Sequence, residues 1–94
     1  MKICHIVGHG DQRAIKECLA LKKKGHEIIF LTRNVNSYTN FFDAYKIWGS
    51  DETLVAAIKS TEADIFHVHC KPANIPAVSI RTLKEMGKKW VYDV

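Results

Sequence analysis

This sequence of 94 residues lacks the features that identify membrane, secreted, disordered or fibrous proteins. No apolar run approaches the ~20 residues that a membrane-spanning helix needs. The opening MKICHIVGHG has one lysine, a short apolar run and no small-residue cleavage site, so it predicts a strand rather than a signal peptide. Two prolines and five glycines are too few for a disordered or fibrous chain. We therefore expect one globular domain over residues 1–94.

Cysteine is also scarce, and its spacing excludes two common roles. Cys4, Cys18 and Cys70 lie far apart, and no pair has the CxxC spacing of zinc or redox motifs. An odd number of isolated cysteines fits a reducing compartment better than a disulfide framework. We expect a cytoplasmic protein, and the net charge of +4 leaves attachment to the periphery of an anionic membrane open as well.

The positive charge does not have the pattern of a nucleic-acid interface. The densest basic run, Lys22–Lys24, closes a predicted helix, where cations offset the negative end of the helix dipole. A nucleic-acid footprint would interleave basic residues with exposed aromatic side chains or place them on a reading helix. We therefore expect no nucleic-acid partner.

Apolar strand patterns alternate with amphipathic helix patterns along the whole chain. The predicted strands are Lys2–Gly8, His26–Thr32, Ala44–Gly49, Asp64–Cys70 and Trp90–Val94. The first helix runs to Lys24 after a cap at Asp11, and Gly25 stops it. The second opens at Ser50 with Leu54, Val55 and Ile58 facing inward. The third has Pro76 in its first turn, an apolar stripe of Ala77, Ile80 and Leu83, and its end at Gly87.

This alternation predicts a doubly wound, Rossmann-like α/β fold with a parallel sheet in the order 3-2-1-4-5 and three α/β/α layers. Ligands of such folds bind beyond the carboxyl ends of the strands, where the strand order reverses. The residues expected there, as substrate- or phosphate-binding residues, are Gly8, His9, Gly10, His69 and Lys71. The glycine turn can bring backbone N–H groups to a phosphate, or it can simply permit a tight turn. Arg13 occupies the third glycine position of the dinucleotide fingerprint, which is therefore incomplete.

Two histidines of the predicted fourth strand raise the question of a metal site. His67 and His69 lie on the same face, because side chains two residues apart in a strand point the same way. Cys70 is adjacent, and Cys4 and His5 lie on the neighbouring strand. A His-x-His pair gives two ligands in a line, with no acid or third ligand at an established spacing. We therefore expect hydrogen-bonded imidazoles, no metal and no cofactor.

No catalytic residue can be assigned from the sequence. The serines lie in predicted turns or helices without an elbow motif, and the carboxylates are spread over helix starts. The chain ends on the last residue of a predicted strand, which leaves that strand uncovered. We expect a truncated domain or one half of a larger protein, with self-association through this exposed last strand.

Two long stretches together resemble the amino-terminal domain of GT-B glycosyltransferases of group 1, the family 4 type. LALKKKGHEIIFLT (Leu19–Thr32) is similar to the helix, Gly-His and second strand of that domain. Asp64–Val94 is similar to its D-hydrophobic-H-x-H strand, the following helix, and the V-Y-D strand before the active-site loop. The resemblance covers most of the chain except the middle, residues 34–51.

The resemblance implies a sugar transfer from a nucleotide-sugar donor to a sugar or lipid acceptor. It places Gly8, His9 and Gly10 near the donor phosphates and the acceptor, and His69 and Lys71 on the acceptor side. The family's functional histidine would follow Val94, and its donor-binding glutamates belong to a carboxy-terminal domain. The 94 residues alone are thus expected to be inactive. Two alternatives stay open: a small nucleotide- or phosphate-binding module, or half of an NADP-dependent oxidoreductase, in which Arg33 would meet the 2′-phosphate.

Overall fold

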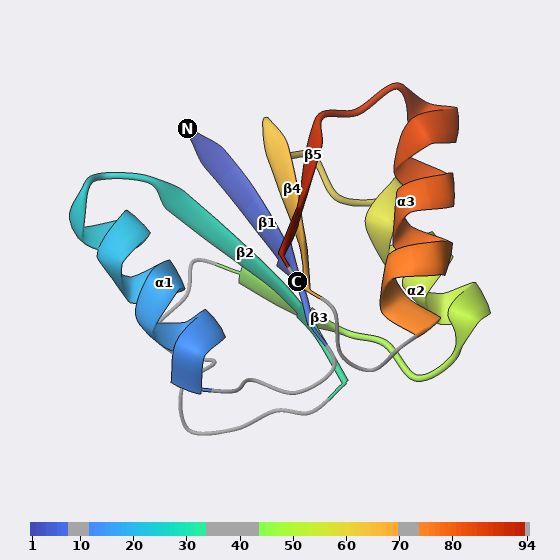
Figure 1. The fold of residues 1–94 in the computed structure, drawn as a ribbon, viewed down its shortest axis with the longest axis horizontal. Helices are drawn as coiled ribbons and strands as arrows, with labels where there is room; N and C mark the ends of the chain where they lie inside the picture. The colour runs from blue at the N-terminus through green and yellow to red at the C-terminus, as the bar shows by residue number, and fades with distance from the viewer. Residues whose placement is uncertain (8–11, 34–43, 70–73, 94) are drawn as a thin grey trace.

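The computed structural model describes residues 1–7, 12–33, 44–69 and 74–93. Its elements are β1 (Lys2–Ile6), α1 (Gln12–Lys23), β2 (Glu27–Thr32), β3 (Ala44–Ile47), α2 (Asp51–Lys59), β4 (Ile65–His69), α3 (Asn74–Met86) and β5 (Trp90–Asp93). The strands form one five-stranded parallel sheet in the order β3-β2-β1-β4-β5 (Figure 1). The predicted fold class and strand order are confirmed.

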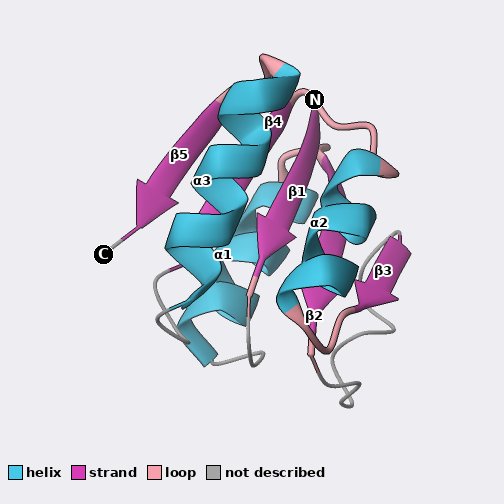
Figure 2. Ribbon diagram, turned by 90° about the vertical axis from the view of Figure 1, so that its right-hand side faces the viewer, coloured by secondary structure: helices cyan, strands magenta, loops and turns pink. Residues whose placement is uncertain are grey.

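Helices lie on both faces of the sheet. Figure 2 shows α2 and α3 in front of it and α1 behind. Alternate residues of the central strands therefore face different helices: Cys4 and Ile6 of β1 pack with α2 and α3, whereas Ile3 and Val7 pack with Cys18 of α1. This is the three-layer arrangement that the sequence predicts.

The helix ends follow local sequence signals. Ser50 caps α2: its hydroxyl accepts from the Thr53 amide, and the Thr53 hydroxyl accepts from the Ser50 amide at 2.8 Å. Gly25 after α1 has φ +92°, and Gly87 after α3 has φ +67°, which glycine adopts at low cost. Each glycine amide donates to a carbonyl of the last helical turn, at Lys22 and Lys84 respectively. The predicted cap at Asp11 lies outside the described residues.

The inward face of α3 differs from the predicted one. Leu83 is buried as expected, but Ala77 is exposed and Ile80 is only half-buried. The buried positions are Ile75, Val78, Ser79, Thr82 and Leu83. Thr82 is tolerated there because its hydroxyl donates to the Val78 carbonyl at 2.9 Å. The predicted stripe missed the apolar residues Ile75 and Val78, and it did not allow for a buried threonine that bonds back to its own helix.

The sheet is less protected at β5 than at its centre. Val91 is 46% exposed and Tyr92 is 42% exposed. Trp90 is half-buried against the cluster beneath α2 and α3. Self-association through this strand stays a prediction. Among the described residues, no helix is both long enough and apolar enough to span a membrane.

Candidate functional site

The predicted ligand edge is formed by the carboxyl ends of β1 and β4. These strands are neighbours, with Ile6 paired to Val68, and the order of the sheet reverses between them. The carboxyl ends of these two strands therefore lie side by side at the edge where doubly wound folds bind ligands. Gly8, His9, Gly10 and Lys71 lie outside the described residues. His69 is described, as the last residue of β4, and it is half-buried.

His69 belongs to a cluster of three histidines on the α1 face of the sheet, which we call the histidine cluster (His5, His67 and His69). His5 is the register partner of His67 across β1 and β4, and His69 follows two residues later on the same face. One ring nitrogen from each residue can be chosen so that all three lie within 4.8 Å of one another. The sequence thus predicts correctly that His67 and His69 share a face.

The rings are in direct contact. His67 and His69 stack with centroids 4.3 Å apart and an angle of 11° between their planes. The His5 ring is tilted by about 35° to His67, at 4.9 Å. Its Nδ1 lies 3.1 Å from Nε2 of His69, so one of these two nitrogens carries a proton and donates to the other.

His5 is the most enclosed member of the cluster. Its side chain is fully buried, and its Nε2 has no hydrogen-bond partner within the described part of the chain. Burial, followed by the neighbouring His67 and His69, lowers the pKa of His5 from 6.5 to about 3. His5 is therefore a neutral imidazole at neutral pH, and a neutral imidazole is the form that binds metals.

The third histidine corrects the sequence-based view of this strand. The sequence predicted only two possible ligands, His67 and His69, because it does not fix which residue of β1 is paired with which residue of β4. The register pairs His5 with His67, and Cys4 lies on the opposite face, buried beneath α2 and α3. Alternation within β1 could have shown that Cys4 and His5 lie on opposite faces, but it is the pairing of β1 with β4 that puts His5 on the face of His67.

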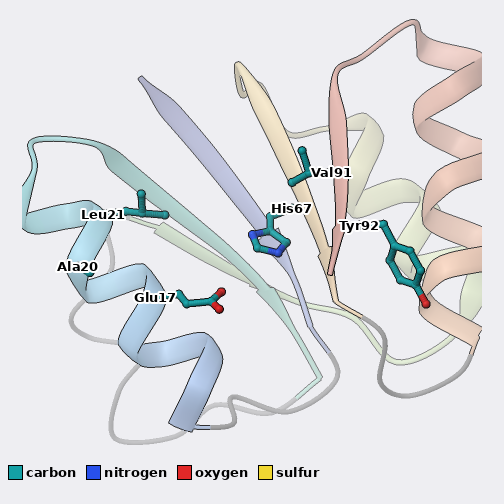
Figure 3. A pocket seen from close by; sticks show the side chains of 6 residues that line it. All are labelled: Glu17, Ala20, Leu21, His67, Val91 and Tyr92. Carbon is teal, nitrogen blue, oxygen red and sulfur yellow. The ribbon is translucent and has the colours of Figure 1, made fainter. Parts of the chain in front are cut away.

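A groove of about 500 Å³ opens beside the cluster on the α1 face. It is lined by Glu17, Ala20, Leu21, His67, Val91 and Tyr92 (Figure 3). In the close-up the Glu17 carboxylate extends from α1 toward the strand that carries His67. A second hollow, at the amino-terminal ends of the strands, includes Met1 and Asp64. The first groove is the one that combines an imidazole with a carboxylate.

Arg33 directly follows β2. Its side chain is exposed, and its guanidinium lies 5.3 Å from the ring centre of Trp48. Trp48 is buried, and its indole N–H donates to the Val7 carbonyl at 3.1 Å. Arg33 is thus a solvent-facing residue stacked on an aromatic ring at the carboxyl edge of the sheet.

Comparisons with known proteins support the fold and go no further. No family model matches the chain, and no curated protein does. Among solved structures, it is similar to glycinamide-RNase-transformylase T from Mycobacterium tuberculosis, with a TM-score of 0.69 at 18% sequence identity. The match covers 96% of this chain and 25% of that protein. The chain has a Rossmann-like α/β fold, and at this identity the likeness concerns the fold alone.

Proposed function

We propose that this chain is the acceptor-side, amino-terminal domain of a GT-B glycosyltransferase that uses a nucleotide-sugar donor. One observation supports the proposal above the others. The strand that carries the D-hydrophobic-H-x-H stretch, β4, adjoins β1 where the sheet reverses, and His69 ends it at the carboxyl edge. Ligands of doubly wound folds bind at that edge.

In this proposal different residues at the carboxyl edge of the sheet bind the donor and the acceptor. The proposal assigns Gly8, His9 and Gly10, which come after β1 in the chain, to the donor phosphates, which backbone N–H groups bind well. His69 and Lys71 lie toward the sugar or lipid acceptor. The chemistry itself needs a carboxy-terminal domain as partner, so no catalytic role falls on these 94 residues. We propose that the enzyme acts in the cytoplasm, and at the periphery of the membrane if its acceptor is a lipid.

The test is nucleotide release from UDP-sugars and GDP-sugars by the complete gene product that contains this chain. We expect turnover by the complete product and none by the 94 residues alone. His69→Ala should lower kcat/KM by about tenfold, the factor that one lost hydrogen bond of ~1.4 kcal/mol supplies. His26→Ala, at the opposite end of the sheet, is the matched control. Turnover by the 94 residues alone, or its absence from the complete product, would refute the proposal.

A nucleotide- or phosphate-binding module is the second candidate, and one observation favours it. The fold is Rossmann-like, and the sequence Gly8-His9-Gly10 comes soon after β1, the strand after which such folds often carry a phosphate-binding glycine segment. A thermal melt of the chain with ADP, UDP or NADPH distinguishes the candidates. A module predicts a Tm that rises with ligand concentration. A response to NADPH alone would instead favour the oxidoreductase half.

A further inference from the structure

The histidine cluster has the composition and placement of a metal centre. His5, His67 and His69 come from two neighbouring strands, and their chosen ring nitrogens lie within 4.8 Å of one another. Imidazole nitrogen is a preferred ligand of Zn²⁺ and of neighbouring transition metals. Three protein ligands with a fourth position left open is the usual arrangement of catalytic zinc sites. We propose that His5, His67 and His69 bind a divalent transition-metal ion, Zn²⁺ in the first place, with one position open to the groove.

One pair of nitrogens already has the separation that a shared ion requires. Nδ1 of His5 and Nε2 of His69 are 3.1 Å apart. Two nitrogens bound to one tetrahedral Zn²⁺ at ~2.0–2.1 Å lie ~3.3 Å from each other. An ion can therefore replace the hydrogen bond of this pair with a change of a few tenths of an ångström.

His67 must turn to complete the site. Its ring stacks almost parallel on His69, and parallel rings direct their lone pairs side by side rather than at one point. Rotation about the second side-chain torsion of histidine is broad and inexpensive. His67 is half-buried and lines the groove, so there is space for that rotation (Figure 3).

A purely structural role accounts poorly for His5. A buried imidazole is ordinarily satisfied through both ring nitrogens. Within the described part of the chain, Nε2 of His5 has no partner, and Nδ1 meets only another histidine. A buried nitrogen of His5 without a partner among the described residues, beside two further imidazoles, is explained more simply by a set of metal ligands than by core packing alone.

The groove determines the kind of site. His67 and Glu17 both line it, from β4 and from α1. A carboxylate that lines the same groove can accept a proton from a metal-bound water or hold a ligand histidine in place. The open position is thus adjacent to an acid and to a space of about 500 Å³. This inference is independent of the proposed sugar transfer, because it concerns ion binding by the chain alone.

The experiment is a titration of the tag-free, metal-stripped chain with Zn²⁺ by calorimetry and with Co²⁺ by visible absorption. We expect one ion per chain and the intense visible bands of low-symmetry, four-coordinate Co²⁺. His67→Gln should weaken Zn²⁺ binding by about a hundredfold or more, since even outer-shell changes cost 10–100-fold. His26→Gln, a histidine outside the cluster, should leave it unchanged.

Three further variants make the result decisive. His69→Gln should weaken binding as His67→Gln does, while Glu17→Gln should change the Co²⁺ spectrum more than the affinity. Because His5 is buried, His5→Gln is interpreted only if its circular dichroism matches that of the parent chain. Binding that is absent in the parent chain, or as strong in His67→Gln and His69→Gln as in the parent chain, would overturn the proposal, whatever the result of the sugar-transfer assay.

Discussion

On one face of the sheet, α2 and α3 cover a continuous apolar cluster, whereas on the other α1 packs over a smaller one that adjoins three histidines. The larger cluster includes Trp48, Leu54 and Phe66, all nearly or fully buried. The smaller one is built around Cys18, Ile28 and Phe30, and the groove opens beside it. The same strands thus contribute alternate residues to a well-packed layer and to a layer that includes three imidazoles and a groove.

The largest expected effect comes from removing one phenylalanine from each face. Phe66→Ala, beneath α2 and α3, should lower the free energy of unfolding by about 3–5 kcal/mol. Phe30→Ala should cost less, because the α1 face adjoins an open groove that lets side chains relax into the space. Urea unfolding of both variants measures the difference. Equal losses would contradict the idea that the faces are packed differently.

Low pH should lower the stability of the fold through His5, which lies on the α1 face. The unfolded chain takes up a proton on this residue near pH 6.5, whereas the folded chain does so only near pH 3. Unfolding therefore binds a proton between these values, so stability falls as the pH falls. From pH 7 to pH 5 the loss is roughly 2 kcal/mol for this group.

Urea unfolding of the metal-stripped chain at the two pH values checks this expectation. His5→Gln, which cannot be protonated, should show a smaller difference between pH 7 and pH 5. A loss of the same size in parent and variant would assign the acid sensitivity to other groups.

A smaller effect is expected at the start of α2, on the better-packed face. Ser50 and Thr53 satisfy each other's backbone amides in a capping box. Ser50→Ala should lower the free energy of unfolding by about 1 kcal/mol. Ser60→Ala, at the other end of α2, is a useful comparison, although it also removes a hydroxyl that Lys46 contacts at 2.8 Å. A thermal melt that is unchanged in Ser50→Ala would show that packing alone holds the helix start.

The smallest expected effect is a difference in the rate at which one buried cysteine on each face is labelled. Burial raises the pKa of Cys4, and burial together with Glu17 raises the pKa of Cys18 to about 12. Neither thiol should react with iodoacetamide in the native protein, because the thiolate is the reactive form. In mild urea, Cys18 should be labelled before Cys4, since the face with fewer buried contacts opens locally at lower cost. Peptide-resolved mass spectrometry of a labelling time course tests the order, and simultaneous labelling would indicate a single cooperative unit.

Sequence reasoning captured the fold because the signals for it are local. Ser50, Gly25 and Gly87 stand beside amphipathic runs and so mark helix boundaries, and apolar runs that alternate with helices favour a parallel sheet with right-handed crossovers. The candidate site was harder to predict, because it depends on the register between neighbouring strands. That His5 meets His67 follows from how β1 and β4 are paired, which no short-range pattern fixes. The groove likewise depends on where α1 lies over the sheet, and a helix pattern states only which face is apolar.

The Trp48 indole donates a hydrogen bond to the Val7 carbonyl, so the fluorescence of Trp48 can report on changes at the carboxyl end of β1. Val7 immediately precedes Gly8 in the chain, so we expect a ligand that binds to residues 8–10 to change the hydrogen bonding that the indole senses. The chain has one other tryptophan, Trp90, which lies half-buried in β5 with the Lys84 ammonium 6.0 Å from its ring centre. A Trp90→Phe variant would emit from Trp48 alone. Its fluorescence would then follow events at the carboxyl edge without any attached dye.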